Sequence, residues 1–136
     1  MAKKQLDIKA QADLTRAWAE ADYAGVCPVR QTLDSVGDKW TVLVVLRLGV
    51  EKQRFLQLLR AVDGISQRML TVTLRKLERD GLVRRTVLDT RPPTVEYELT
   101  VLGNSLLKPI GMLAEWAIEN QPAMDAMRAA YDEGKN

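Results

Sequence analysis

Arginines gather on one side of a predicted helix that spans residues 66–80. At about 100° per residue, the leucines of this segment fall on one face and its arginines on the opposite face. The outer face carries Arg68, Val72, Arg75 and Arg79, with Thr71 and Lys76 at its flanks. A guanidinium group can donate two hydrogen bonds to guanine O6 and N7, and small side chains can contact the thymine methyl. The pattern therefore predicts a helix that reads duplex DNA in the major groove.

A basic helix face is more often simply solvated, so the surroundings of this one matter. Its only acids, Glu78 and Asp80, lie toward the sides. The segment after the helix has the pattern of a β-hairpin that contains Arg84, Arg85 and Arg91. We expect Arg91 to lie at a minor groove. Since adjacent strand residues face opposite ways, at most one of Arg84 and Arg85 should face DNA.

Further basic residues precede this helix. Arg54, at the start of a short helix, could contact a phosphate, or could instead pair with Glu51. Lys39 could also reach a phosphate. The complete set of predicted DNA-binding residues is Lys39, Arg54, Ser66, Gln67, Arg68, Thr71, Val72, Arg75, Lys76, Arg79 and Arg91.

The distribution of charge agrees with a polyanion-binding face. The 136 residues carry a net charge of only +2, but residues 52–91 hold ten Lys or Arg against four Asp or Glu. This segment is therefore locally +6 and the remainder −4. The length indicates one domain with helical extensions.

The chain lacks the residues that several classes of function require. The chain has no histidine, its glycines are scattered rather than grouped in a phosphate-binding loop, and no nucleophile motif is present. Asp34 and Asp38 lie one turn apart without a third ligand, so no metal site is expected. We expect neither an enzyme nor a bound cofactor.

The chain has no long apolar run and its first residues do not resemble a signal peptide. Its single cysteine, Cys27, cannot form an internal disulfide. A cytoplasmic protein that does not enter the membrane is the expectation.

Periodicity and capping signals predict a mostly α fold with a small β-hairpin. Helices are expected at 8–24, 28–36, 38–49, 54–62 and 66–80, and strands at 82–88 and 94–99. Ser66 should cap the fifth helix, and Gly81 should end it. Thr100 should cap a long helix that Pro109 kinks, and a last short helix should start near Pro122.

The order and spacing of these segments resemble the HxlR-type winged helix-turn-helix regulators, a branch near the MarR regulators. The segments that carry the resemblance are CPVRQTLDSVGDKW, RFLQLLRAVDGIS, LTVTLRKLERDGLVRR and PPTVEYELTVLG, followed by Trp116. The resemblance covers residues 27–116. It implies a transcription regulator, with repression the expected sign, that binds a pseudo-palindromic operator as a homodimer. Its recognition helix would be 66–80 and its wing 82–99.

The resemblance also implies a division of the chain. Residues 1–26 would be an N-terminal helical extension, 27–119 the HxlR-type winged-helix DNA-binding domain, and 120–136 a C-terminal dimerisation helix. The terminal helices have more apolar surface than one small domain can cover. The predicted dimer interface comprises Leu14, Trp18, Leu107, Ile110, Leu113 and Trp116.

Some relatives in this family sense oxidants or electrophiles through a cysteine at the position of Cys27. The free N–H groups of the following predicted helix, and Arg30 one turn on, would favour a thiolate. The alternative is a half-buried cysteine that only packs. A disulfide would have to join two chains or capture a small thiol, and any small-molecule or oxidant effector is unidentified.

A second function uses the same arginines differently. Because a fold does not determine a function, the chain could be a protein–protein module that binds an acidic partner. A salt titration against random duplex separates the two, since DNA binding weakens steeply as salt rises.

Overall fold

The computed structural model describes residues 2–20 and 27–134. The chain forms two compact units, Met1–Asp38 and Lys39–Asn136.

The first unit contains α1 (Ala2–Ala19) and α2 (Pro28–Val36). α1 begins earlier than the predicted 8–24 helix, and the end predicted for that helix near Gly25 lies outside the described residues. α2 agrees with its prediction. Pro28 occupies the first turn, where its missing N–H group costs no hydrogen bond, and the Gly37 N–H donates to Leu33 O at 2.8 Å.

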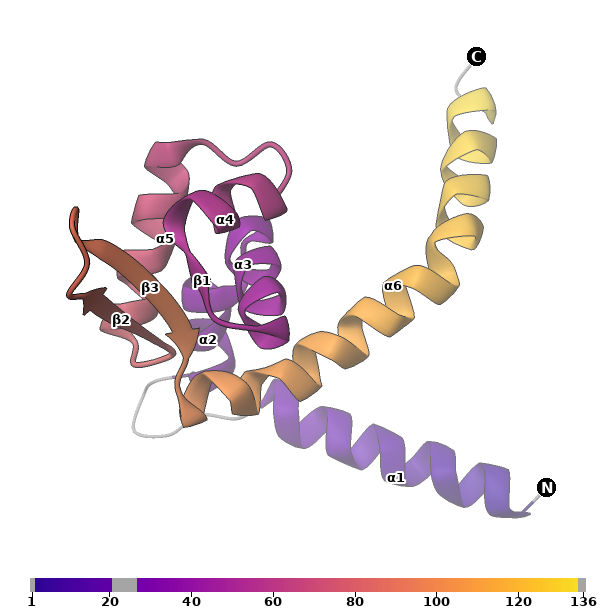
Figure 1. Cartoon of the computed structure of the whole chain (residues 1–136). Coiled ribbons are helices and arrows are strands. Elements are labelled where there is room, and N and C mark those ends of the chain that lie inside the picture. Colours follow the sequence, from indigo (N-terminus) through magenta and orange to yellow (C-terminus); the bar gives the residue numbers. More distant parts are fainter. Residues whose placement is uncertain (1, 21–26, 135–136) are drawn as a thin grey trace. The chain divides into compact units, whose positions relative to one another are not determined.

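The second unit has the predicted order of helices around a hairpin (Figure 1). Its elements are α3 (Lys39–Val50), β1 (Gln53–Arg54), α4 (Phe55–Ala61), α5 (Gln67–Arg79), β2 (Val83–Leu88), β3 (Thr94–Leu99) and α6 (Val101–Gly134). Apolar residues of α3, α4 and α5 form the centre of the core. The most deeply buried of these are Val44, Val45, Leu58, Leu70, Leu74 and Leu77. This is the mostly α architecture that the sequence predicts.

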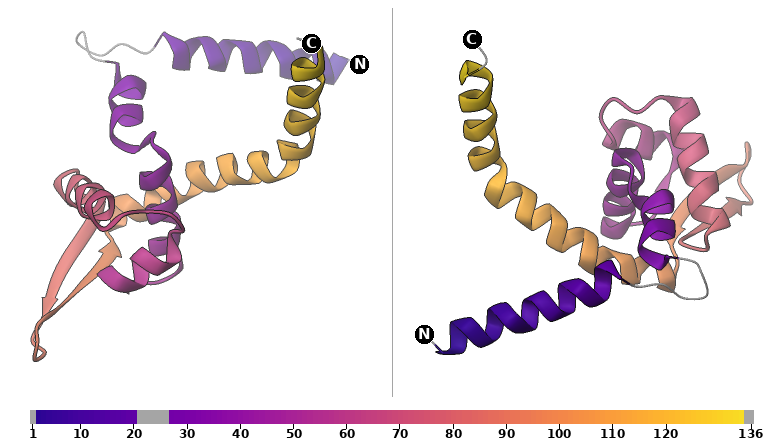
Figure 2. Two further views of the ribbon diagram at one scale, coloured as in Figure 1. Left: turned by 90° about the horizontal axis from the view of Figure 1, so that it is seen from above. Right: turned by 180° about the vertical axis from the view of Figure 1, so that it is seen from behind.

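The sheet has one strand more than predicted. β1 pairs with β3, and β3 pairs with β2, so the antiparallel order is β1–β3–β2. A strand of two residues is too short to show an alternating pattern, so the sequence did not reveal it. Val83, Tyr97 and Leu99 are buried and point from the sheet toward the helices. The end of β2 and the start of β3 extend away from the helices as a two-stranded wing (Figure 2).

The two ends of α5 have the predicted caps. Ser66 Oγ accepts a hydrogen bond from the Met69 N–H at 3.0 Å. At the other end, Gly81 adopts a φ of 76°, which favours glycine because other residues are strained there. Local interactions therefore define both ends of α5, and its C-terminal end leads directly into the wing.

Thr100 begins α6 and connects it to the end of α5. Its hydroxyl donates to Gly81 O at 2.6 Å and accepts from the Gly103 N–H at 3.1 Å. Gly103, near the start of α6, lies close to the beginning of the wing. A Cβ atom at Gly103 would meet the backbone carbonyl of Leu82, at the start of the wing.

α6 continues without a break through Pro109 and Pro122 to Gly134. The separate short helix predicted from Pro122 was therefore wrong, although α6 bends visibly in its second half (Figure 1). A proline inside a helix removes one backbone hydrogen bond but can be accommodated by bending.

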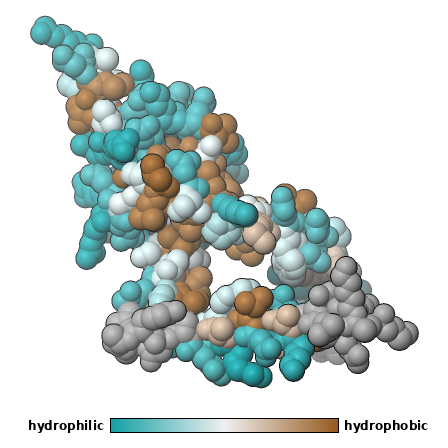
Figure 3. All heavy atoms as spheres, turned by 90° about the horizontal axis from the view of Figure 1, so that it is seen from below, coloured by the Kyte–Doolittle hydropathy of each residue, from teal (hydrophilic) through white to brown (hydrophobic). Residues whose placement is uncertain are grey.

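None of the helices within the described residues combines the length and hydrophobicity needed to span a bilayer. Large apolar side chains nevertheless reach the surface between polar ones, as Figure 3 shows for one face of the molecule.

Candidate nucleic-acid interface

The outer face of α5 carries the side chains that the sequence assigned to it. Leu70, Leu74 and Leu77 are at most 1% exposed, so they anchor the helix in the core. The residues that project from the opposite side are Gln67, Arg68, Val72, Arg75 and Arg79, all exposed, with Thr71 and Lys76 half-buried beside them. Val72 is 52% exposed, which leaves a methyl-bearing surface among the guanidinium groups.

The guanidinium groups of this face take part in no ion pair within the part of the chain that the structure describes. The salt bridges among the described residues do not include Arg68, Arg75, Arg79 or Arg91. Lys76 differs from them, because it already has an interaction partner. The donor groups of the four arginines are therefore available to an external acceptor.

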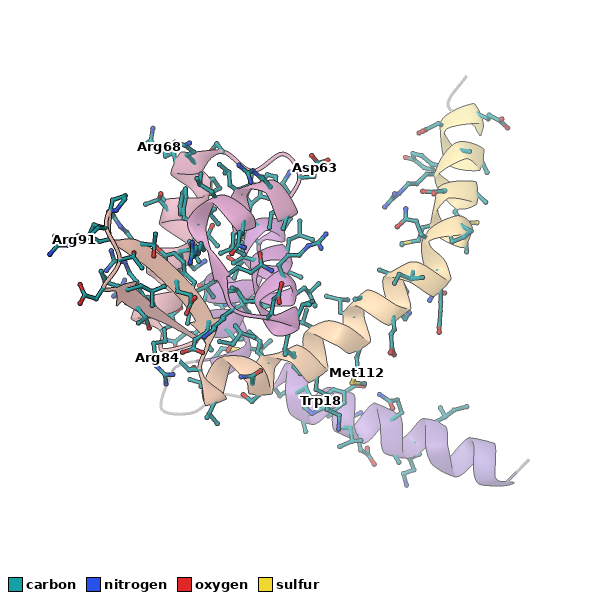
Figure 4. All side chains as sticks on the ribbon, viewed as in Figure 1. Trp18, Asp63, Arg68, Arg84, Arg91 and Met112 are labelled. Atoms are coloured by element: carbon teal, nitrogen blue, oxygen red, sulfur yellow. The ribbon has the colours of Figure 1, made fainter. Side chains whose placement is uncertain are left out.

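The tip of the wing presents Arg91, which is exposed and points away from the helices (Figure 4). Thr90 holds the turn around it: its hydroxyl accepts from the Thr94 N–H at 3.1 Å and donates to Pro92 O at 2.9 Å. These bonds cross the turn, so Arg91 projects from a fixed support.

The two adjacent arginines of β2 have different surroundings. Arg84 Nη1 lies 3.1 Å from Glu98 Oε1 on the neighbouring strand, and Figure 4 shows Arg84 pointing outward. Arg85 is opposite Tyr97 in the register and shares the sheet face that points toward α5. The expectation that these two residues face opposite ways follows from the pleat, and the structure identifies Arg85 as the one beside α5.

Arg85 and α5 enclose a cleft of about 320 Å³. It is lined by Thr71, Leu74, Arg75, Glu78, Arg85 and Tyr97. Two guanidinium groups thus approach one space from different elements, with one carboxylate beside them. Arg85 is not among the residues predicted from the sequence to bind DNA. The sequence did contain a clue to its position. Arg85 lies two residues after Val83 and therefore shares its strand face, and the apolar Val83 side chain has to face the core.

The earlier basic residues lie on other parts of the second unit. The Arg54 side chain is exposed and makes no ion pair with Glu51, while the Arg54 N–H donates to Gln57 Oε1 at 2.8 Å. Lys39 is the first residue of α3, and its Nζ atom lies 4.5 Å from the centroid of the Trp40 ring. Such cation–π contacts contribute about 0.5–1 kcal/mol at exposed sites, so Lys39 can still leave the ring for a phosphate.

In the first unit, Cys27 is a partly exposed free thiol directly before Pro28. It occupies the N-cap position of α2, and the exposed Arg30 follows within the first turn. Among the described residues, no group of three or more His, Cys, Asp or Glu is placed to hold a metal ion.

The residues predicted for a dimer interface divide into two groups. Ile110 is only 6% exposed and belongs to the core of its own chain, so the expectation that it is exposed was wrong. Leu107 is half-buried and packs near Gly49 of α3. Leu14, Trp18, Leu113 and Trp116 are each at least 50% exposed. The apolar residues of α6 contact the core in the first part of the helix and reach the surface further along. The sequence did not show at which residue this change occurs.

Known proteins provide an independent comparison. Residues 35–125 match the family model described as HxlR-like helix-turn-helix. An uncharacterized HTH-type transcriptional regulator, YdeP of Bacillus subtilis (strain 168), is 39% identical over 113 residues, which cover 83% of this chain and 88% of YdeP.

Solved structures of regulators have the same fold. The redox regulator HypR in its reduced form superimposes with a TM-score of 0.69 at 39% identity, covering 73% of this chain and 98% of HypR. Diamide-treated YodB from B. subtilis gives a TM-score of 0.60 at 30% identity, covering 69% of this chain and 94% of YodB.

The matched residues include α3 to α5, the wing and most of α6. The family and these relatives are transcription regulators, which confirms the expectation that the chain is not an enzyme. The chain belongs to the HxlR-like helix-turn-helix family of transcription regulators.

Proposed function

We propose that this protein binds specific duplex DNA sequences by inserting α5 into the major groove. The observation that carries the proposal is the outer face of α5, where exposed arginines have no ion-pair partner within the described chain. An α-helix fits the width of the major groove, and arginine is the residue that most often reads guanine there. Arg68 and Arg75 would read bases, and Val72 would contact a thymine methyl.

The remaining residues would position the protein on the DNA backbone. Arg79, Lys76, Lys39 and Arg54 would contact phosphates, which fix register without reading sequence. The Gln67 amide would contribute a neutral hydrogen bond. The Thr71 hydroxyl already donates to Gln67 O at 2.9 Å, so Thr71 would present its methyl group to the DNA. The Ser66 oxygen already accepts from the Met69 N–H, so its O–H group is the part left to donate to a phosphate. Arg91, at the wing tip, would enter a minor groove.

The active species would be a homodimer on a pseudo-palindromic operator, acting in the cytoplasm as a repressor. Exposed apolar residues on α1 and α6 support the assembly, since large apolar patches on a soluble protein usually mark an interface. Two recognition helices related by a twofold axis would be separated by one turn of DNA, roughly 34–36 Å.

Oxidation of Cys27 would modulate this binding. The partly exposed thiol at the start of α2 and the similarity to the redox regulator HypR and to diamide-treated YodB support this part of the proposal. The chain has one cysteine, so oxidation by diamide would join Cys27 of two chains, or Cys27 and a small thiol, in a disulfide. Each disulfide formed would reduce one diamide to its hydrazine, with both thiol protons transferred to it.

Selection of bound duplexes from a random pool tests the proposal directly. We expect enrichment of a sequence with two inverted half-sites about ten base pairs apart, centre to centre. The enriched duplex should lose affinity steeply between 50 and 200 mM salt, as phosphate contacts require. A pool that shows no enrichment and no binding at low salt would refute DNA recognition and favour the acidic-protein partner.

A further inference from the structure

A groove separate from the outer face of α5 lies between α4 and the start of β3, two elements that pack against each other. We name it the α4–β3 groove. Its volume is about 430 Å³, within the range of roughly 300–1,000 Å³ that is typical of small-molecule sites. It is lined by Arg54, Phe55, Leu56, Gln57, Arg60, Thr94 and Val95.

The charged groups of this groove are all cationic. Arg54 and Arg60 are exposed, and neither takes part in the ion pairs of the described residues. No carboxylate is among the lining side chains. Two guanidinium groups that face one space repel each other, and an anion placed between them converts this repulsion into attraction. The charge of the groove therefore selects an anionic occupant.

The polar groups next to these arginines are oriented by the fold. The Gln57 Oε1 atom accepts from the Arg54 N–H at 2.8 Å, so the Gln57 amide nitrogen remains as a donor. The groove thus offers guanidinium and amide donors, as an anion needs.

The rest of the lining is hydrocarbon. Leu56 is 55% exposed although its neighbours Phe55 and Leu58 pack into the core. Val95 is half-buried at the opposite wall. An inorganic anion or a phosphodiester would leave this apolar surface exposed to water, whereas a hydrocarbon body would cover it, which is favourable.

We propose that the α4–β3 groove binds small carboxylic acids that have a body of one or two hydrocarbon rings. The carboxylate would accept hydrogen bonds from Arg54 and Arg60, a pairing that guanidinium geometry favours. The ring body would lie against Leu56, Phe55 and Val95. Arg54 is also a proposed phosphate contact, so the groove and the DNA interface would share this one residue. Binding of the acid in the absence of DNA does not depend on base reading by α5.

The test is calorimetric titration of the full chain with 2-naphthoate, without DNA. Its neutral analogue 2-naphthamide has the same ring body and lacks the charge. We expect one naphthoate per chain and a dissociation constant at least about tenfold weaker for naphthamide, because the charge-assisted hydrogen bonds are lost. Equal affinities for the two compounds, or no binding of naphthoate at millimolar concentration, would overturn the proposal.

Matched variants locate the site. Arg60→Ala should weaken naphthoate binding about tenfold or more, because a charged donor is removed. Arg47→Ala removes an exposed arginine outside the groove and should have no effect. Leu56→Ser should weaken binding, whereas Leu102→Ser, at a leucine of similar exposure, should not. All four residues are at the surface, and circular dichroism of each variant confirms that it is folded.

Naphthoate binding that survives both Arg60→Ala and Leu56→Ser would show that the compound binds elsewhere, and the site would be refuted. This result would leave the DNA-binding proposal intact, because neither residue lies on the outer face of α5. Conversely, loss of DNA binding in α5 variants would not affect naphthoate binding.

Discussion

At the scale of single residues, the arginines that are candidates for DNA contact differ from the others in their ion pairs within the chain. Arg84 is held by Glu98, at 3.1 Å across the strands. Arg85, the next residue, faces the cleft beside α5 together with Arg75. The two residues have the same side chain, but they lie on opposite faces of the sheet and therefore have different surroundings.

This difference gives a paired prediction. Arg85→Ala should weaken binding of a selected duplex and lower the slope of log affinity against log salt by about one, as expected for one lost phosphate contact. Arg84→Ala should leave both quantities nearly unchanged, since that side chain is already engaged. Fluorescence anisotropy at several salt concentrations measures both. Equal effects of the two variants would contradict the expectation that Arg85, and not Arg84, contacts the DNA.

Cys27 provides a second prediction at this scale. Treatment with diamide should change the affinity of the wild-type protein for its duplex, because the disulfide alters or cross-links α2 at its first turn. Cys27→Ser should bind the duplex with unchanged affinity before and after treatment. Anisotropy and non-reducing electrophoresis report binding and cross-linking together. An unaltered affinity in the treated wild type would refute the proposal that this oxidant regulates DNA binding.

At the scale of elements, the sequence predicted those with strong local signals. The leucine period, Ser66 and Gly81 defined α5, and the β-branched runs defined the wing. β1 was missed because its two residues become a strand only by pairing with β3. α6 was divided in two because Pro122 is a helix-breaking signal, which packing and bending override in this fold.

The contact between α6 and the wing gives a stability prediction. Gly103→Ala should lower the free energy of unfolding by about 1–3 kcal/mol, since the new methyl group overlaps the Leu82 carbonyl and the backbone has to shift. The control is Gly111→Ala in the same helix, where a Cβ meets nothing within 4 Å. It should raise the stability by about 0.5–1 kcal/mol through helix propensity. Urea titration followed by circular dichroism measures both free energies of unfolding. A Gly103→Ala variant as stable as the wild type would disprove the predicted overlap with the Leu82 carbonyl.

At the scale of the whole molecule, family membership follows from the matched residues, whereas dimerisation and operator choice are proposals. Ile110 shows why an interface is difficult to predict from sequence. The same apolar periodicity serves the chain's own core at Ile110 and remains exposed at Leu113 and Trp116. Only the fold shows which positions are already covered. The exposed arginines of α5 were easier to predict, because positive charge opposite a leucine stripe has to face outward.

The exposed part of α6 predicts the oligomeric state. The wild type should be a dimer by light scattering at micromolar concentration. A double variant, Leu113→Glu with Trp116→Glu, should be a folded monomer, because a buried interface cannot hold unpaired carboxylates. Val50→Glu, at a valine that is 78% exposed, should remain dimeric. A monomeric wild type, or a double variant that stays dimeric, would contradict the assignment of this interface.

We propose that the exposed arginines of α5, which form no ion pair among the described residues, read base sequence. The most direct measurement is the affinity of Arg68→Ala and Arg75→Ala for the selected duplex and for a scrambled duplex. We expect a loss of about 1–3 kcal/mol in binding free energy on the selected duplex and a smaller loss on the scrambled one, since a base contact is removed. If both variants bind and discriminate the two duplexes as the wild type does, α5 is not the recognition helix.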